Sequence, residues 1–202
     1  RTRRPHPLAP RRLTPDRMAT PCPDFTCPVT GFAFTRPERW AFMPPAWMHP
    51  EREAAWPESP AGVAAARLAE DPIAVCYRDH GSMRHINPTA QLFRRPWPHT
   101  VPIAQVLGAM QSHFTGLYDD AKFEVLTDHA MLAGARAAHY VVRFTQGVRV
   151  EDEVVPYRTR LTGYTLIARG HALTFTVATS TTKAYRMDDE VAALLASARF
   201  AQ

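Results

Sequence analysis

The chain has 202 residues, 46% of them apolar and 21% charged, so it can bury the core of one sizeable domain and does not have the composition of a disordered protein. No run approaches about 18 apolar residues, and no apolar stretch precedes a small-residue cleavage site, so we expect neither a membrane-spanning helix nor a signal peptide in this chain. Six of the 24 basic and one of the 19 acidic residues fall in residues 1–17, which leaves 18 of each in the rest of the chain. This balance argues against a nucleic-acid-binding domain, which would carry a basic face.

The sequence predicts a leader followed by one domain. Residues 1–30 are rich in arginine and proline and are expected to form a flexible leader without regular structure. Residues 31–202 are expected to form a single domain, because they contain no internal repeat and no change in composition that would mark a domain boundary. Of the 24 basic residues, 22 are arginine, a bias typical of high-GC bacterial genomes. We therefore expect a bacterial protein of the cytoplasm or the periplasm.

The first half of the domain alternates short elements with loops. Phe32 and Phe34 predict a strand that runs into a turn ending at Trp40, whose large side chain is expected to anchor the turn in the core. Residues 44–60 are rich in proline and tryptophan and predict a long insertion. The elements expected next are a helix over 61–69, a strand over 73–77, a loop over 79–83, and a strand over 85–94 with Asn87-Pro88 at an edge or bulge.

The strongest helix signal lies between residues 103 and 117. Apolar residues follow one another there at intervals of 3, 1, 3, 4 and 3 positions, namely Ile103, Val106, Leu107, Met110, Phe114 and Leu117. This spacing predicts one continuous apolar face, with Thr100 as a cap. A strand over 122–126 and a turn over 132–136 are expected to follow.

Residues 137–200 predict three strands and a helix. Residues 138–145 alternate between two faces, and a loop over 147–156 is expected to separate them from a second strand over 157–168. Arg169-Gly170 predicts a tight hairpin into a third strand. After Tyr185 the apolar spacing becomes helical, with three carboxylates in the first turn. Short connections make neighbouring strands antiparallel, so we expect an α+β fold with a central antiparallel sheet flanked by helices.

Four short motifs occur along the chain in a recognisable order. They are Phe32-Ala-Phe-Thr-Arg-Pro-Glu-Arg-Trp40, then Ile86-Asn-Pro-Thr-Ala-Gln-Leu92 before the long helix, the Arg169-Gly170 hairpin, and the closing Leu194-Leu-Ala-Ser-Ala-Arg-Phe200. Together they resemble the PsbP-like superfamily, named after the photosystem II extrinsic protein. The resemblance covers most of residues 31–200 and implies an α-β-α sandwich.

The resemblance also implies a function in binding. Members of the superfamily include photosystem subunits, a nuclear transport cofactor, bacterial envelope lipoproteins and effector-associated chaperones of type VI secretion. It therefore implies a non-catalytic accessory or adaptor protein that binds a protein partner in a bacterial envelope, secretion or photosynthetic assembly, without a cofactor. This chain differs from those members in its insertion over 44–60 and in having no lipobox ahead of Cys22.

A small enzyme is the alternative hypothesis. Asp79, His80 and His85 share one loop and could bind zinc or a harder metal, although their spacing matches no strong zinc signature. Cys76 could be a thiol nucleophile, but its apolar neighbours favour a buried core residue. The sequence contains no nucleophile elbow, phosphate loop or dinucleotide fingerprint. We therefore assign no catalytic or metal-binding residue.

Binding could use loops or a face of the sheet. The strand over 157–168 carries apolar groups on both faces, so either helices cover both faces, which we favour, or one face is left for a partner. Tryptophans in Pro-rich loops either anchor partners or fold back onto the domain. The residues predicted to bind a protein are Trp47, Trp56, Trp97, Tyr164 and Leu166.

Overall fold

The computed structural model describes residues 24–43, 71–82, 84–98, 101–150 and 153–201. In these residues a large antiparallel sheet has the strand order β3-β4-β5-β9-β8-β7-β6, and a small sheet has the order β1-β2-β10. The large sheet contains β3 (Ala41–Phe42), β4 (Ala74–Tyr77), β5 (Thr89–Pro96), β6 (Lys122–Leu132), β7 (Ala135–Val150), β8 (Glu153–Ala168) and β9 (His171–Ser180). The small sheet contains β1 (Asp24–Thr26), β2 (Phe32–Thr35) and β10 (Arg199–Phe200), and the helices are α3 (Ala104–Leu117), a 3-10 turn η2 (Lys183–Tyr185) and α4 (Asp188–Ala196).

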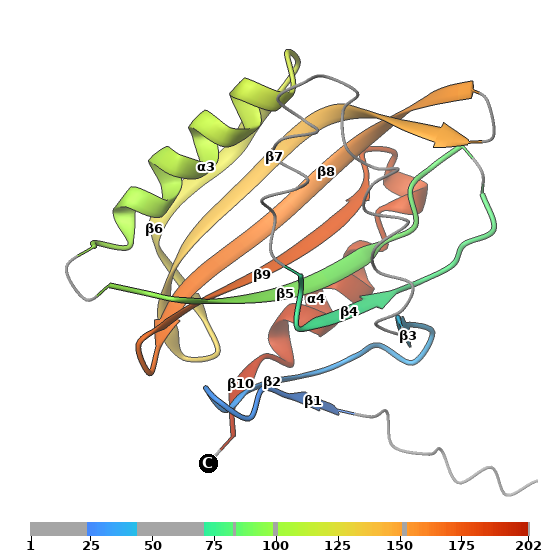
Figure 1. Cartoon of the computed structure of the whole chain (residues 1–202). Helices are drawn as coiled ribbons and strands as arrows, with labels where there is room; N and C mark the ends of the chain where they lie inside the picture. Colours follow the sequence, from blue (N-terminus) through green and yellow to red (C-terminus); the bar gives the residue numbers. More distant parts are fainter. Residues whose placement is uncertain (1–23, 44–70, 83, 99–100, 151–152, 202) are drawn as a thin grey trace, which may run out of the picture.

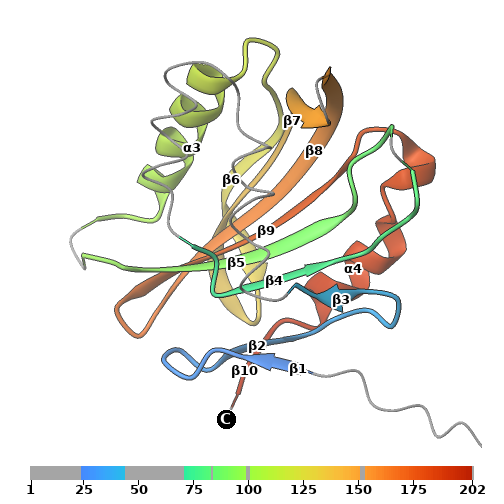
Figure 2. The same cartoon turned by 45° about the vertical axis from the view of Figure 1, so that its right-hand side comes forward.

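Helices lie on both faces of the large sheet (Figures 1 and 2). α3 packs over β6 and β7 on one face, whereas α4 and the small sheet cover the other. Apolar side chains divide between the two faces because successive strand residues point to opposite sides. The predicted α+β fold, a central antiparallel sheet flanked by helices, is confirmed. No helix in the described residues is long and apolar enough to cross a membrane.

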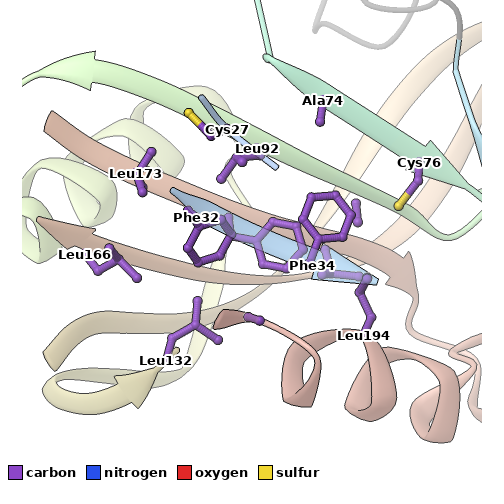
Figure 3. Close-up of a cluster of buried hydrophobic side chains, with 14 of the residues drawn as sticks. Cys27, Phe32, Phe34, Ala74, Cys76, Leu92, Leu132, Leu166, Leu173 and Leu194 are labelled. Atoms are coloured by element: carbon purple, nitrogen blue, oxygen red, sulfur yellow. The ribbon is translucent and has the colours of Figure 1, made fainter. Parts of the chain in front are cut away.

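The larger core lies between the large sheet, the small sheet and α4 (Figure 3). The ring of Phe175 on β9 lies 5.9 Å from that of Phe32 and 5.0 Å from that of Phe34, both on β2. Leu194 of α4 is fully buried in the same cluster. The strand predicted around Phe32 and Phe34 therefore belongs to a second sheet, which seals one face of the first.

Trp40 fixes the turn after β2, as the sequence predicts. Its side chain is 1% exposed, and its Nε1–H donates a hydrogen bond of 2.7 Å to Oε2 of Glu190. Glu190 lies in the first turn of α4 and also pairs with the guanidinium of Arg78. Burial alone raises the pKa of Glu190, but the hydrogen bonds from Arg78 and Trp40, with the charges of Arg78 and Arg39, lower it overall. One carboxylate thus joins the Trp40 turn, the end of β4 and α4.

A smaller core lies beneath α3. Phe114 of α3 contacts Tyr140 and Phe144 of β7, with ring centroids 6.0 and 5.4 Å apart. The Tyr140 side chain lies against Gly163, its register partner on β8. A Cβ atom at Gly163 would stand 2.2 Å from Cζ of Tyr140, so only glycine leaves room for the ring.

The predicted loop over 147–156 is wrong. β7 extends to Val150 and β8 begins at Glu153, and Pro156 pairs with Gly147. β9 pairs with β8 only from Thr159 onward, so no described strand lies beside the other edge of β8 at Pro156. A proline, which has no N–H to donate, is tolerated at such an edge, and this is why Pro156 does not end the strand.

Other boundaries also differ from those expected. Residues 24–26 form β1 and pair with β2, although this segment was expected to lack regular structure. β5 begins at Thr89, because Pro88 cannot donate to the ladder, and it extends to Pro96 because β9 provides partners that far. β6 continues to Leu132 through two irregularities in its pairing.

The helices and tight turns agree with the sequence. α3 and α4 occupy the predicted stretches, and β4 occupies most of the strand predicted over 73–77. The hairpin turns Ala133-Gly134 and Arg169-Gly170 both have two successive positive φ angles, as two-residue type I′ turns require. The insertion over 44–60 and the helix over 61–69 lie outside the described residues.

Candidate functional site

A groove of about 720 Å³ lies between α3 and the large sheet. A helix with its side chains is about 10 Å wide, and neighbouring strands lie about 4.8 Å apart, so one helix covers about two strands. α3 covers β6 and β7, and the same face of β8, β9 and β5 continues beside it. Within the described part of the chain, the groove therefore lies beside α3, over the strands that this helix does not cover.

Alternate residues of two neighbouring strands form most of the groove floor. Strand register places Gln91, Phe93 and Arg95 of β5 opposite Thr176, Thr174 and Ala172 of β9. Thr165 of β8 continues the row of Thr174, and their hydroxyl oxygens lie 3.0 Å apart. The two hydroxyls satisfy one another, so this row presents both methyl and hydroxyl groups to the groove.

One face of α3 forms the wall. The residues of this face that line the groove recur at helical spacing, and they are Gln105, Val106, Ala109, Met110, His113 and Phe114. Val106 and Phe114 are buried on the side of α3 that faces the sheet, whereas Gln105, Ala109 and His113 are exposed to solvent. The wall is thus apolar at depth and polar toward solvent.

The connection from β5 to α3 closes one end of the groove. The indole Nε1–H of Trp97 donates to the carbonyl oxygen of Val101 at 2.9 Å, and both residues line the groove. The backbone N–H of Trp97 donates to the carbonyl of Gly170 at 2.9 Å, which ties the connection to the β8–β9 turn. Trp97 is therefore held by hydrogen bonds at both its backbone and its ring.

The described lining contains basic ionisable groups. Arg95 and His113 line the groove, and no Asp or Glu occurs among the described lining residues. Burial lowers the pKa of His113, and the nearby charge of Arg95 lowers it further, so His113 is largely neutral at pH 7. Arg95 supplies the permanent positive charge of the groove.

The residues predicted to bind a protein do not form one site. Trp97 lines the groove, but Tyr164 lies on the other face of the sheet, where its ring stacks on His139 with centroids 4.2 Å apart. Leu166 is 1% exposed and belongs to the larger core, so it is not available to a partner. Trp47 and Trp56 lie outside the described residues.

The histidines of the alternative metal site have structural contacts. His80 Nδ1 accepts a hydrogen bond from the N–H of Ser82, and its Nε2 lies 2.8 Å from the carbonyl oxygen of Ile86. His85 stacks on Tyr185, with centroids 4.0 Å apart. Across the described residues, no group of three or more His, Cys, Asp or Glu side chains is placed to hold a metal ion.

Cys76 lies in the core, as the sequence predicts. Its side chain is fully buried in the larger core, and burial raises its pKa to about 12. A thiol nucleophile needs a lowered pKa and access to solvent, and Cys76 has neither. Cys22 lies outside the described residues.

Sequence reasoning missed most of the groove. The strand predicted over 85–94 contains Phe93 but ends before Arg95, and neither residue was assigned to a site. The available signal is the alternation of Gln91, Phe93 and Arg95, which places an aromatic ring between two polar groups on one face of β5. This pattern shows a face that is neither fully buried nor fully solvated, but it does not show what lies above it.

No protein-family model and no curated protein matches the chain. Solved structures similar to it include LpqN, involved in cell envelope biogenesis of Mycobacterium tuberculosis, at 11% identity and a TM-score of 0.48, covering 90% of this chain and 86% of that one. They also include cyanobacterial PsbP (CyanoP) from Synechocystis sp. PCC 6803, at 13% identity and a TM-score of 0.44, covering 89% of this chain and 92% of that one.

Proposed function

We propose that this chain is a binding domain, acting as an accessory protein of a bacterial envelope, secretion or photosynthetic assembly, and that its ligand binds in the groove beside α3. The observation that carries the proposal is the groove itself. Its volume of about 720 Å³ lies within the range of about 300–1,000 Å³ usual for ligand sites. Its lining combines aromatic and aliphatic groups with polar ones, which include the threonines of the floor and the exposed Arg95, Gln105 and His113.

The contacts of the enzymatic candidates support binding over catalysis. Cys76 is buried with a raised pKa, and His80 uses both ring nitrogens within its own loop. Activating either group would require the core or the loop to rearrange. A protein partner, predicted from the family resemblance, remains a further part of this proposal.

The proposal is tested by filling the groove from the helix side. Ala109 lines the groove on α3, whereas Gln111 is exposed on the same helix and is not part of the lining. Ala109→Trp should weaken binding of the neutral apolar probe N-phenyl-1-naphthylamine by at least about tenfold, followed by fluorescence titration. The matched control Gln111→Trp should bind the probe like the original chain.

Two results would contradict the proposal. The first is a probe that binds equally well to both tryptophan variants, because the probe would then bind elsewhere. The second is an original chain that does not bind the probe although circular dichroism shows that it is folded.

A further inference from the structure

Three polar side chains lie in one register row across the groove side of the large sheet. Register pairs Tyr140 of β7 with Gly163 of β8, Gly163 with Thr176 of β9, and Thr176 with Gln91 of β5. Tyr140, Thr176 and Gln91 all line the groove, and Gly163 has no side chain. These three residues, which we call the polar row, bring two hydroxyl groups and one carboxamide to the same part of the groove.

The missing side chain of Gly163 lets the phenol of Tyr140 extend along the row. A Cβ atom at Gly163 would stand 2.5 Å from Oη of Tyr140, so this hydroxyl lies over β8, on the way from its own strand to Thr176. Phe114 of α3 packs against the ring, with centroids 6.0 Å apart. The phenol is therefore positioned by packing.

The polar row has no hydrogen-bond partner within the described part of the chain. Tyr140 is 2% exposed and Thr176 is 8% exposed, yet neither hydroxyl bonds to another described residue, and the half-buried amide of Gln91 does not either. The next pair along β8 and β9, Thr165 and Thr174, bond to one another at 3.0 Å. Buried polar groups are nearly always hydrogen-bonded, because an unpaired one costs free energy. Three unpaired groups in one row indicate a site whose partner comes from outside the chain.

The chemistry of the polar row favours a neutral partner. Burial raises the pKa of Tyr140, so its phenol stays protonated at pH 7, and Thr176 and Gln91 carry no charge. Each hydroxyl donates and accepts, and the amide of Gln91 places a donor beside an acceptor in one plane. A carboxamide, lactam or imide presents the complementary pair, an acceptor beside a donor. Such a group can therefore pair with Gln91 and still bond to the hydroxyls.

Apolar side chains flank the polar row on both sides along the strands. Phe93 follows Gln91 by two positions on β5, and Leu161 precedes Gly163 by two positions on β8, so both lie on the groove side of the sheet. Both side chains are half-buried. A ligand whose amide meets the polar row therefore finds apolar surface beside it for the rest of the molecule.

We propose that Gln91, Thr176 and Tyr140 bind the neutral amide group of a ligand, a carboxamide, lactam or imide, whose apolar part lies against Phe93 and Leu161. This inference rests on the proposed function, because it names the class of ligand for the same groove. It also adds a prediction. Moving an amide out of water costs free energy, so a purely apolar groove prefers a ketone of the same shape, whereas the polar row prefers the amide.

The test uses two ligands that differ in a single group. 4-Butylbenzamide carries a carboxamide, and 4′-butylacetophenone has a methyl group in place of the amide nitrogen. Each is titrated into the purified full chain by isothermal calorimetry. The original chain should bind the amide at least about fivefold more tightly than the ketone, because without the N–H donors the acceptors of the polar row stay unpaired.

Three near-isosteric variants remove the polar groups one at a time. Gln91→Leu, Thr176→Val and Tyr140→Phe should each weaken the amide by about three- to tenfold, and Gln91→Leu should reverse the preference over the ketone. The matched control is Thr162→Val, because Thr162 is also 8% exposed but lies on the opposite face of β8, outside the groove lining. This control should bind both ligands like the original chain.

A second measurement does not depend on the choice of ligand. Because neither hydroxyl has a partner in the part of the chain that the structure describes, Tyr140→Phe and Thr176→Val should leave Tm unchanged or raise it in the absence of ligand. Thermal melts followed by circular dichroism measure this and show whether each variant is folded. A fall in Tm of several degrees would mean that the hydroxyl stabilises the fold, and would overturn its assignment to a ligand.

The outcomes separate this inference from the proposed function. If the ketone binds as tightly as the amide or more tightly, and Ala109→Trp blocks both, the groove is a binding site but the amide inference is wrong. The same holds if N-phenyl-1-naphthylamine binds and neither ligand does. If Thr162→Val weakens the amide as much as Thr176→Val, the polar row is not the site and the inference is overturned. If neither the ligands nor N-phenyl-1-naphthylamine bind to the original folded chain, both proposals fail.

Discussion

Replacing Gly163 by alanine should disturb both the smaller core and the groove. A Cβ atom at Gly163 would stand 2.2 Å from Cζ and 2.5 Å from Cε1 and Oη of Tyr140, whereas ordinary contacts begin near 3.4 Å. The ring would have to withdraw by about 1 Å or more, but Phe114 packs against it from α3. Overpacking of this kind costs about 1–3 kcal/mol. For a domain of this size, a loss of about 2 kcal/mol lowers Tm by about 4–8 °C.

A thermal or urea melt followed by circular dichroism measures the effect. The matched control is Gly108→Ala, because an added Cβ at Gly108 meets no atom within 4 Å and alanine favours the helix, so stability should rise by about 0.5–1 kcal/mol. In a Tyr140→Leu background, Gly163→Ala should cost much less than in the original chain, because the clashing ring is absent. The reasoning is refuted if Gly163→Ala is as well tolerated as Gly108→Ala, or if its cost does not depend on Tyr140.

Three further outcomes are expected from the fold. Glu190→Gln should lower stability by about 2 kcal/mol at pH 7, because charge-assisted hydrogen bonds are lost. Since the pKa of Glu190 is lowered in the folded state, its contribution to stability is present above the unfolded pKa of about 4.3 and is lost as the pH falls through the folded pKa. The difference in free energy of unfolding between the original chain and Glu190→Gln, measured in urea melts, should therefore shrink toward pH 3. A difference that grows there would contradict this linkage. Because Cys76 is buried and its pKa is raised, it should resist alkylation by iodoacetamide at pH 8 in the folded chain and react once the chain is unfolded in urea. Mass spectrometry of the peptide that contains Cys76 measures the labelling. Rapid labelling without denaturant would contradict the buried position of Cys76. Arg169→Asn should raise stability by about 0.5–1 kcal/mol, because Asn tolerates the positive φ of 49° better than Arg, and an unchanged Tm would show that this turn carries no strain.

Several local features could be predicted because neighbouring residues determine them. The apolar spacing from Ile103 to Leu117 gave the helix, and the Arg169-Gly170 pair gave the tight hairpin. The ends of the strands were less predictable, because whether a strand can contain a given residue depends on the strands that lie beside it. Pro156 continues a strand because β9 does not extend beside it, whereas Pro88 precedes one.

The candidate site was largely beyond the reach of the sequence. Its floor combines residues far apart in the chain, such as Phe93 and Thr174, which only strand register places side by side. Periodicity showed that the sheet has two apolar faces, and in the described residues α3 and α4 lie on opposite faces, with α3 over β6 and β7. Nothing in the spacing of apolar residues indicates which strands a helix will cover.

The sequence by itself determined the two described helices, the tight hairpins and most of the long strands, because helical and strand periods and turn residues act over a few positions. It also determined the burial of Trp40 and Cys76, since large or apolar side chains in apolar surroundings move away from water. For the residues that the structure describes, the tertiary structure alone decided that α3 lies over β6 and β7, beside a groove lined by β8, β9 and β5. Placement of a helix on a sheet depends on the packing of distant residues, in this case Phe114 against Tyr140 beside Gly163, and that packing exists only once the chain has folded.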